Sequence, residues 1–384
     1  MNITRASALL GGLSPAQFMK RHWQKKPLLV RQAVPGVAPP MGRAALFELA
    51  GQGGVESRLV ERDAEGWRLR SGPFARRSLP PLARPGWTLL VQGVDLHLDA
   101  AHELLQRFRF IPDARLDDLM ISYATDGGGV GPHFDSYDVF LLQVQGRRRW
   151  RIGRQRDLTL QAGAPLKLLA RFTPEQTFDL DPGDMLYLPP RWAHDGVALG
   201  ACMTCSIGFR APAAHELARE LMHRIADAHG DAVGAAARPS LYRDSDQPAA
   251  ASPGRIPSAL QAFAQRALHA AQRDPLALSR ALGEVLCEPK ATVWFERRPT
   301  PRRLQHLVLD RRTRMLFDEH HVFINGESHR ARGQGAALLR RLADRRMLGP
   351  SDLRDAGPAL RALLSSWCEA GWLHPSDPAA DDAA

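Results

Sequence analysis

Two stretches decide what this chain folds into and what it can bind: Gly131-Pro-His-Phe-Asp-Ser-Tyr-Asp138 and Leu180-Asp-Pro-Gly-Asp-Met-Leu-Tyr-Leu-Pro-Pro-Arg-Trp-Ala-His194. His133 and Asp135 are two residues apart, so on a β-strand their side chains would share one face. His194 follows a Pro-Gly turn and a short apolar strand. Two imidazoles and one carboxylate leave coordination positions open, which is typical of a non-haem Fe(II) oxygenase, whereas zinc prefers a closed tetrahedral site. The pattern therefore predicts iron ligands at His133, Asp135 and His194.

The region around these stretches is rich in short strands. Apolar runs alternate there with Gly- and Pro-containing turns, as in a double-sheet jelly roll. The strands that we expect are Leu28–Val30, Trp87–Gly93, Leu119–Thr125, Tyr137–Gln145, Arg147–Ile152, Thr177–Leu180, Met185–Leu188 and Met203–Phe209.

The pattern changes after Pro212. Helical spacing of apolar residues predicts helices over His215–Ala228, Ala259–Gln272 and Leu276–Leu286. Short strands and helices then alternate, with strands at Val293–Phe295, His306–Leu309 and Val322–Ile324, a tight hairpin turn at Asn325-Gly326, and helices at Ala336–Ala343 and Ala359–Ala370.

These elements predict an α+β protein with several parts. Residues 1–211 form a double-stranded β-helix (jelly-roll, cupin) catalytic domain with a short helical lead-in, in which Ser14 and Pro15 begin a helix. Residues 212–287 form a helical region whose apolar stripes can pair with a second copy of the chain. Residues 288–377 form a winged-helix-like domain, and residues 378–384 a disordered tail.

Composition narrows the class of protein. The formal net charge is +10, but only five of the 51 basic residues are Lys, so the excess of Arg reflects a GC-rich coding bias as much as function. No apolar run approaches the roughly 20 residues that span a bilayer, and residues 8–13 are too short and too Gly-rich for a signal peptide, so we expect a cytoplasmic protein. Cys202 and Cys205 have the spacing of a metal or redox pair, but an odd spacing on a strand points their thiols to opposite faces.

One arginine stands out in the run Gly146-Arg-Arg-Arg-Trp-Arg-Ile-Gly153. On a strand Arg148 shares a face with Trp150 and Ile152, and this apolar pair marks the inner face. A buried guanidinium needs an anion, and its planar fork suits a carboxylate. The distal carboxylate of 2-oxoglutarate is the candidate beside a three-ligand iron, and a protein carboxylate such as Asp184 is the alternative.

With these motifs the chain resembles the JmjC-type 2-oxoglutarate oxygenases, and within them the bacterial ribosomal oxygenases of the YcfD/RoxA type. The resemblance covers most of residues 20–212. It rests on Arg21-His-Trp-Gln-Lys-Lys-Pro27, Ser57-Arg-Leu-Val60, Gly72-Pro-Phe74, Asp117-Asp-Leu-Met-Ile-Ser122, Gly127-Gly-Gly-Val-Gly-Pro-His133, Tyr137-Asp-Val-Phe140, Gly146-Arg-Arg-Arg-Trp-Arg151, Pro182-Gly-Asp184, Pro189-Pro190, His194 and Gly208-Phe-Arg-Ala-Pro212. Ala124 departs from it, because a Ser is expected there; Ser122 and Thr204 are alternative pocket contacts.

The resemblance implies a specific chemistry. His133, Asp135 and His194 match the iron ligands of the family, and Arg148 matches its 2-oxoglutarate-binding residue. The family uses Fe(II), 2-oxoglutarate and O₂ to hydroxylate the β-carbon of a residue in a ribosomal protein, and the bacterial members act on an arginine of large-subunit ribosomal protein sixteen. A guanidinium substrate needs acidic and aromatic groups at the pocket mouth, for which Tyr123, Asp126 and Tyr137 are candidates.

Two other functions fit parts of the sequence. One is a 2-oxoglutarate oxygenase of a small molecule. The other is a regulator in which a cupin sensor is fused to a DNA-binding winged helix. Residues 288–377 hold 16 Lys or Arg and 11 Asp or Glu with both signs interspersed, whereas a recognition helix carries a one-sided basic face. We therefore expect no specific DNA binding and no membrane association, and a ribosomal protein as the partner.

Overall fold

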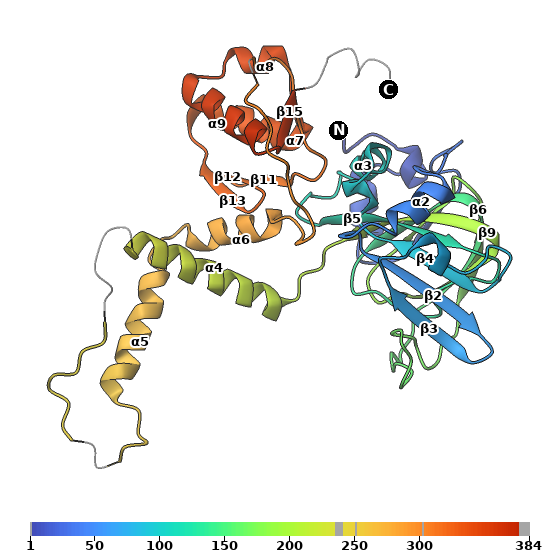
Figure 1. The fold of residues 1–384 in the computed structure, drawn as a ribbon, viewed down its shortest axis with the longest axis horizontal. Coiled ribbons are helices and arrows are strands. Elements are labelled where there is room, and N and C mark those ends of the chain that lie inside the picture. The colour runs from blue at the N-terminus through green and yellow to red at the C-terminus, as the bar shows by residue number, and fades with distance from the viewer. Residues whose placement is uncertain (1, 235–240, 250–251, 302, 376–384) are drawn as a thin grey trace. The chain divides into compact units, whose positions relative to one another are not determined.

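The computed structural model describes residues 2–234, 241–249, 252–301 and 303–375. By density of internal contacts the chain divides into two compact units, Met1–Ala211 and Pro212–Ala384 (Figure 1). The tail predicted at residues 378–384 lies outside the described residues.

A nine-stranded antiparallel sheet forms the first unit, in the order β1-β8-β6-β9-β5-β4-β2-β3, with β7 paired to β6. Its strands are β1 (Leu28–Val30), β2 (Ser57–Asp63), β3 (Gly66–Ser71), β4 (Trp87–Val91), β5 (Leu116–Ala124), β6 (Val139–Gly153), β7 (Gln176–Leu180), β8 (Met185–Leu188) and β9 (Ala193–Phe209). The sequence missed β2 and β3, in which charged residues interrupt the apolar pattern; Glu61 on β2 pairs with Arg70 on β3 and with Arg84.

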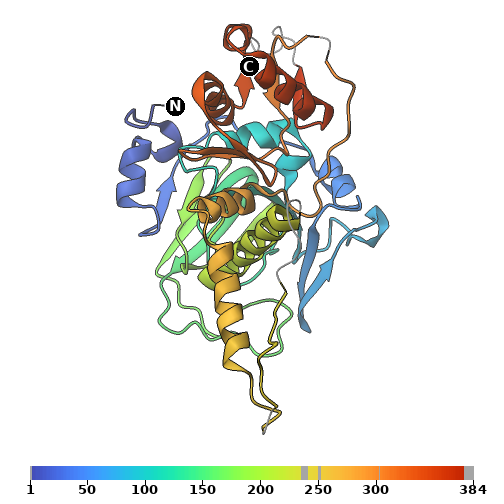
Figure 2. The same ribbon diagram turned by 90° about the vertical axis from the view of Figure 1, so that its left-hand side faces the viewer.

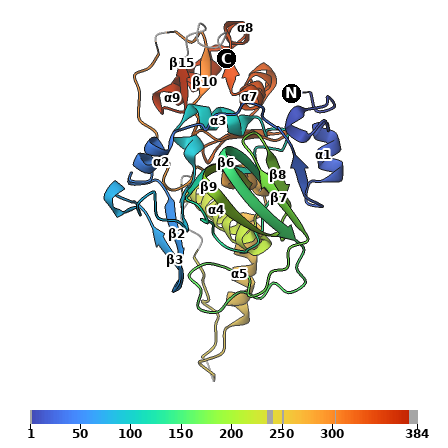
Figure 3. The same ribbon diagram turned by 90° about the vertical axis from the view of Figure 1, so that its right-hand side faces the viewer.

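The long strands β6 and β9 roll this sheet into a jelly roll (Figure 3). β6 pairs with β8 over Val139–Leu142 and with β7 over Arg148–Ile152, while β9 follows it along its whole length. The register shifts between Gln143 and Arg147, where Gly146 has φ +62° and an added Cβ would collide with the carbonyl oxygen of Ala201. The predicted jelly roll is thus confirmed. The prediction of two separate strands at 137–145 and 147–152 was wrong, because pairing with β9 continues across the bulge.

Helices cover the outer face of the sheet and enclose the main core. The helices are η1 (Ala8–Leu10), α1 (Pro15–Arg21), α2 (Arg43–Leu49), η2 (Arg76–Ser78), η3 (Val94–Leu96) and α3 (Asp99–Gln106). The predicted cap of α1 is present, since Ser14 accepts a hydrogen bond from the Gln17 amide and Pro15 is the first helical residue. The largest fully buried side chains of this core include Phe18, Trp87, Phe108 and Phe140.

A smaller apolar cluster fills part of the inside of the roll, and it consists of Val139, Leu141, Trp150, Ile152, Leu180, Leu186 and Leu188. Trp150 and Ile152 lie on the face of β6 that the sequence marked as inner. The two sides of the sheet therefore differ: the outer side is a large aromatic core, and the inner side has room for polar groups beside a small apolar wall.

The second unit begins with α4 (Ala214–Gly234), α5 (Ser258–Ala271) and α6 (Ala277–Cys287). α4 packs mainly along α6 and touches α5 near one end, and α5 extends away from that pair (Figures 1 and 2). The three helices agree with those predicted from apolar spacing.

The remainder of the second unit combines two small sheets with three helices. The sheets are β14-β10-β15 and β11-β12-β13, and the elements are β10 (Leu307–Leu309), β11 (Met315–Phe317), β12 (His321–Ile324), β13 (Glu327–Arg330), α7 (Gly333–Arg345), β14 (Met347–Leu348), α8 (Pro350–Arg354), α9 (Pro358–Glu369) and β15 (Leu373–Pro375). Asn325 and Gly326 form the predicted hairpin turn, both with positive φ. The strand predicted at Val293–Phe295 was wrong: no strand among the described residues pairs with it, and Trp294 is 59% exposed.

Candidate metal centre

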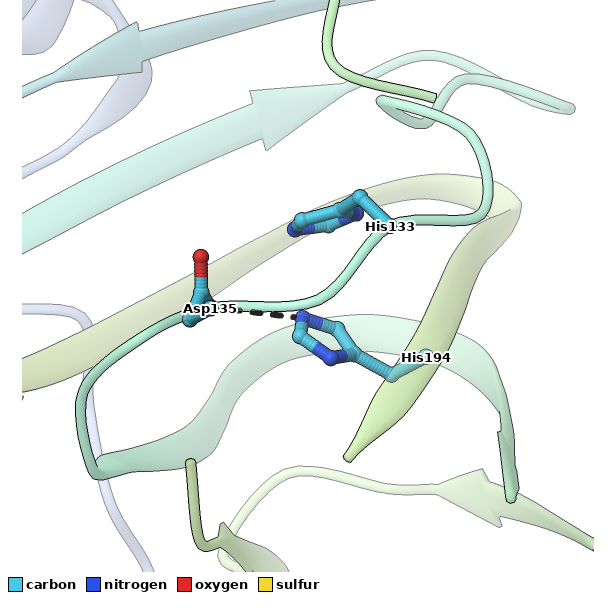
Figure 4. A group of neighbouring side chains, drawn as sticks. All are labelled: His133, Asp135 and His194. Atoms are coloured by element: carbon cyan, nitrogen blue, oxygen red, sulfur yellow. Dashed lines mark ion pairs between the residues drawn. The ribbon is translucent and has the colours of Figure 1, made fainter. Parts of the chain in front are cut away.

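The loop between β5 and β6 brings His133 and Asp135 to the beginning of β9, which carries His194 (Figure 4). His133 and His194 exchange backbone hydrogen bonds of 3.0 and 2.8 Å, and the carbonyl oxygen of Asp135 accepts a 2.7 Å bond from the Arg191 amide. The expectation that His133 and Asp135 share a strand was wrong, because only His133 forms a bridge and Asp135 lies in the loop. Their convergence comes from these backbone bonds and not from strand parity.

The three side chains form one compact donor set. Their possible ligand atoms all lie within 4.8 Å of one another, and His194 Nε2 is 3.6 Å from Asp135 Oδ2. Each imidazole forms a hydrogen bond through its Nδ1 with the backbone carbonyl two residues earlier. His133 Nδ1 lies 2.9 Å from the carbonyl oxygen of Gly131, and His194 Nδ1 lies 2.9 Å from that of Trp192. Such bonds fix the tautomer and leave Nε2 free to bind a metal.

Electrostatics favour a neutral imidazole at His194. Burial, and next the neighbouring His133, lower the pKa of His194 to about 4, and the opposing effect of Asp135 is smaller. A neutral ring presents a lone pair, which is the form that ligates a metal. Two nitrogens and one carboxylate oxygen fit Fe(II) with further positions open, and they do not complete a closed zinc site.

Arg148 is buried on the inner face of β6, with 5% of its surface exposed. Its Nη1 lies 3.4 Å from Ser122 Oγ, while its Nε and Nη2 have no partner among the described residues. The alternative partner, Asp184, is taken by Arg31 at 2.6 Å and by the Gln32 amide at 2.9 Å. A buried cation is thus left without a carboxylate, beside the Trp150 ring at 5.7 Å. The site therefore calls for an anionic ligand.

The neighbouring arginines face the other way, as the parity of the strand predicted. Arg147, Arg149 and Arg151 each pair with a carboxylate on the outer side, namely Asp181, Asp179 and Asp195. Arg149 and its partner Asp179 keep 48% and 29% of their side chains exposed. Because these charges are compensated, Arg148 is the arginine of this run that is available to a ligand inside the roll.

Small and hydroxyl-bearing residues line the inner face next to Arg148. Ser122 pairs in register with Thr204 on β9, and Thr204 donates a 2.9 Å hydrogen bond to Gln143 on β6. Ala124, Ala198 and Cys202 form a separate small cluster, and Gly196 lies under the Trp150 ring, where a Cβ would come within 2.6 Å of it. Sequence reasoning singled out Ser122 and Thr204 only as replacements for Ala124; counting inward positions along β5 and β9 would have found the lining.

The three candidate substrate contacts differ in where they lie. Tyr123 points to the opposite face of β5 from Ser122 and packs in the outer core against Phe47 and Trp87. Its proposed place at the pocket mouth was therefore wrong, because neighbouring residues on a strand face opposite sides. The exposed Asp126 accepts a 2.7 Å hydrogen bond from the Gly200 amide, which is a turn contact.

Tyr137, in contrast, lies beside the metal centre. The residue is 40% exposed. The pKa of its hydroxyl is raised by burial first, then by the charge of Asp135 and a hydrogen bond with it, and also by Asp118, while Arg58 lowers it. A carboxylate has two oxygens, so Asp135 can bind a metal through one and accept a bond from Tyr137 through the other. Of the three candidates, Tyr137 is the one that the structure brings to Asp135.

Cys202 and Cys205 belong to different sides of β9. Both thiols are free and buried. Cys202 lies in the small inner cluster and Cys205 in the outer core, where burial raises the pKa of Cys205. The interpretation of this C-x-x-C as a structural pair on opposite faces is confirmed.

Comparison with known proteins identifies both units. A JmjC-domain family matches residues 103–217, which include His133, Asp135, Arg148 and His194, and a ROXA-like winged-helix family matches residues 269–374. The latter match begins inside α5 and includes α6, whereas the sequence placed the domain boundary at residue 288.

Relatives of known sequence and structure agree with these matches. The chain is 42% identical over 203 residues to the ribosomal protein uL16 3-hydroxylase of Escherichia coli (52% of this chain, 53% of that one). It is 36% identical over 214 residues to a probable ribosomal oxygenase of Haemophilus influenzae (52% and 50%). The matched region thus spans about half the length of these curated relatives.

The structural match is more extensive. The crystal structure of Escherichia coli YcfD has 31% identity and a TM-score of 0.78, with 94% of this chain and 97% of that one covered. The chain belongs to the JmjC ribosomal oxygenases. A second structure of that bacterial ribosomal oxygenase, in complex with cobalt and 2-oxoglutarate, has 30% identity and a TM-score of 0.75 over 94% and 97% of the two chains. The resemblance inferred from the motifs is therefore confirmed for the family.

As for membranes, no helix in the described part of the chain is both long enough and apolar enough to cross a bilayer.

Proposed function

We propose that this protein is an Fe(II)- and 2-oxoglutarate-dependent hydroxylase of a ribosomal protein, and that it adds a hydroxyl to the β-carbon (the 3-position) of an arginine in uL16. The single observation that carries the proposal is the pairing of a His133–Asp135–His194 donor set with Arg148, a buried guanidinium on the inner face of β6 that has no carboxylate partner among the described residues. The first group fits Fe(II), and the second fits the distal carboxylate of 2-oxoglutarate. The uL16 3-hydroxylase of Escherichia coli supports the substrate.

The bound iron, with 2-oxoglutarate and dioxygen, would supply the oxidising power that inserts oxygen into an unactivated C–H bond. In the balanced reaction, one oxygen atom of O₂ enters the substrate as a hydroxyl, and the other enters succinate as 2-oxoglutarate loses CO₂. The residues of this chain have other tasks. His133, Asp135 and His194 would hold the metal, and the Nδ1 bonds of the two imidazoles keep their Nε2 atoms in place.

Arg148 orients the cosubstrate. Its unpaired Nε and Nη2 can donate two parallel hydrogen bonds to one carboxylate, with Ser122 Oγ close to the third donor. The apolar wall of Trp150, Ile152 and Leu180 excludes water from the same space, which strengthens the attraction between the guanidinium and the carboxylate.

The substrate side of the site is acidic and aromatic. The carboxylates of Asp135 and Asp118 raise the pKa of the Tyr137 hydroxyl and the Arg58 guanidinium lowers it, so the partly exposed Tyr137 lies in a largely acidic setting. A guanidinium binds carboxylates through charge-assisted hydrogen bonds and stacks on aromatic faces. This supports an arginine side chain as substrate, with Tyr137 and the exposed Asp126 as candidate contacts.

We further propose that the protein acts as a homodimer and works in the cytoplasm, where ribosomal proteins are made and assembled. Exposed apolar side chains along α4, α5 and α6 support the homodimer; they include Met222 at 65%, Leu268 at 66% and Leu278 at 58% exposure. A symmetric dimer is the commonest way to bury such stripes.

The reaction and the substrate can be tested together. Purified protein would be incubated with Fe(II), 2-oxoglutarate and recombinant uL16, and the peptides of uL16 would be analysed by mass spectrometry. We expect a gain of one oxygen, about 16 Da, on an arginine, with one succinate formed per hydroxyl. No gain on uL16, with turnover on a free metabolite instead, would favour a small-molecule oxygenase.

A further inference from the structure

Asp138 is a fully buried carboxylate that lies outside the metal centre, at the point where the metal-binding loop enters β6. Its Oδ1 accepts a 2.6 Å hydrogen bond from the Tyr187 hydroxyl, and its Oδ2 accepts a 3.1 Å bond from Gln24 Nε2. Arg115 Nη2 lies 3.5 Å from Oδ2. The carboxylate therefore joins four segments that are far apart in the sequence.

This network also holds the lead-in segment against the sheet. Gln24 has φ +55°, and its backbone amide donates a 2.8 Å hydrogen bond to the hydroxyl oxygen of Tyr187. The preceding Trp23 stacks on the Tyr187 ring at 6.0 Å, and the Arg115 guanidinium lies 5.5 Å above the Trp23 ring. The motif Arg21-His-Trp-Gln-Lys-Lys-Pro27 takes no part in the proposed chemistry. Two of its residues, Trp23 and Gln24, contact Tyr187, and Gln24 also contacts Asp138.

Both partners of the short hydrogen bond lead directly to metal ligands. Asp138 follows Asp135 by three residues, and Tyr187 lies on β8, from which the chain runs through Pro189 and Pro190 to His194. The two stretches meet again where the Arg191 amide donates to the Asp135 carbonyl. Consecutive Cα atoms are only about 3.8 Å apart, so a shift at Asp138 moves the backbone that carries Asp135.

Burial makes the network costly to break. Removal from water raises the pKa of Asp138, against the hydrogen bonds of Tyr187 and Gln24 and the charge of Arg115. A buried carboxylate that loses a donor keeps its desolvation cost, so the surrounding backbone rearranges to find another. The loop that contains Asp135 ends at Asp138, where β6 begins at Val139, so this loop is one of the segments that such a rearrangement would move.

We propose that Asp138, held by Tyr187 and Gln24, is a positioning residue that sets the separation between Asp135 and His194 and so sets metal affinity. This inference rests on the proposed function, since it takes His133, Asp135 and His194 as the metal ligands. Asp138 touches neither metal nor substrate; it acts from the outer face of the sheet through the loop that it anchors.

The test is a titration of the full-length protein with Co²⁺ in the presence of 2-oxoglutarate, followed by visible absorption and calorimetry. Asp138→Asn keeps the shape of the side chain but puts an amide donor against Gln24 or Tyr187. Loss of the groups that orient metal ligands typically costs about ten- to a hundred-fold in affinity, so we expect the Kd for Co²⁺ to rise by about ten-fold. Amide hydrogen exchange in residues 133–138 should accelerate in parallel.

A matched control separates positioning from general destabilisation. Leu105→Ala removes a buried side chain from the same outer core on α3 and should lower the melting temperature without changing the Kd. An unchanged Kd and unchanged exchange in Asp138→Asn would overturn the inference. If that variant does not fold, Gln24→Asn decides: it tolerates positive φ but is one methylene too short to reach Asp138, and a raised Kd supports the inference while an unchanged one rejects it.

The wild-type titration distinguishes a failure of the proposed function from a failure of the role inferred for Asp138. If the wild-type protein binds Co²⁺ only weakly and independently of 2-oxoglutarate, the proposed function fails, and the inference fails with it. If the wild type binds both and the Asp138 and Gln24 variants bind as well as it does, only the inference fails.

Discussion

Arg148 is the residue whose role the fold defines most sharply, because its charge is buried and two of its nitrogens have no partner in the part of the chain that the structure describes. Arg148→Met removes the charge and keeps much of the volume. A hydrogen bond to a charged group contributes about 1.5–3 kcal/mol, so the KM for 2-oxoglutarate should rise about ten- to two-hundred-fold in steady-state assays. The matched control is Arg149→Met on the outer face, where the exposed pair with Asp179 predicts little change. Equal effects of the two substitutions would contradict the assignment of Arg148.

The assignment of the metal ligands can also be tested with a single substitution. His133→Ala leaves two side chains of the donor set, so we expect bound iron to fall to background and turnover to stop. The far-ultraviolet circular dichroism should remain that of the wild type, because the outer core of the jelly roll does not depend on a metal. Iron content and spectrum would be measured on the same preparation, and full iron occupancy in the variant would exclude His133 as a ligand.

Sequence reasoning reached some of these residues and not others, for physical reasons. A period of two on β6 was enough to separate Arg148 from its outward neighbours, because a strand alternates its faces without exception unless a bulge intervenes. The same rule, applied to β5, would have placed Tyr123 in the outer core beside the inward Ser122. Asp135 could not be placed by any periodicity, since loop backbone bonds from Arg191 and around His133 bring it to His194.

In β6, Gly146 allows the strand to stay paired with β9 where the register between the two strands shifts. Gly146 combines φ +62° with a backbone carbonyl where a Cβ would stand. Gly146→Ala should therefore lose about 1–3 kcal/mol from strained backbone, with a further loss from the collision with Ala201. Gly163→Ala is the matched control, since it has φ +73° but open space around it. Melting temperatures of the two variants would compare them, and a loss at Gly146 no larger than at Gly163 would contradict the role of the close approach.

Two physical causes account for strands that the sequence missed. In β2 and β3 charged residues interrupt the apolar pattern, and β11, β13 and β14 have only two to four residues. The segment Val293–Phe295, wrongly predicted as a strand, has the right composition but pairs with no strand among the residues that the structure describes. Pairing is a property of the fold, and a local pattern of three residues does not contain it.

In the second unit, Asp310 links β10 to β15 and to its own turn. Arg312 Nε lies 2.7 Å and His374 Nε2 lies 2.6 Å from its carboxylate. Burial alone would raise the pKa of Asp310, but the hydrogen bonds of His374 and Arg312 outweigh it and hold that pKa well below the ordinary value. The unfolded chain therefore binds more protons in acid, so this stabilisation is present above about pH 4 and is lost as the pH falls further.

Calorimetry of the full chain would check this dependence. Asp310→Asn should lower the melting temperature of the second unit at pH 7, and the gap to the wild type should narrow as the pH falls below about 4, because the wild-type carboxylate is then protonated in the unfolded state. Asp355→Asn, at an exposed position after α8, is the control and should show no such gap. A gap that stays constant from pH 7 to pH 3 would contradict the argument.

At the scale of the whole molecule, the winged-helix fold raises the question of DNA binding. Three arginines at the end of α7 make contacts within the domain: Arg340 donates to the carbonyls of Asp318 and Glu319, Arg341 pairs with Asp352, and the C-cap residue Arg346 donates to the carbonyls of Thr313 and Asp310. A helix that reads DNA needs a free, one-sided basic face. These contacts support the prediction that the domain binds no specific DNA sequence, and a gel shift against random duplex at physiological salt would show only weak, salt-sensitive binding.

The homodimer is the prediction that depends on the whole chain. Met222, Leu268 and Leu278 expose more than half of their surface on helices α4, α5 and α6, and burying such side chains is favourable by about 25 cal/mol per Å² of apolar area. Light scattering at micromolar concentration should therefore give twice the chain mass of 42.4 kDa. The double substitution of Met222→Lys and Leu268→Glu should give a monomer, because it places charges in the contact. Leu160→Glu, which changes an exposed leucine of the first unit, should leave the dimer intact. A wild-type monomer that still hydroxylates uL16 would show that catalysis needs no second copy.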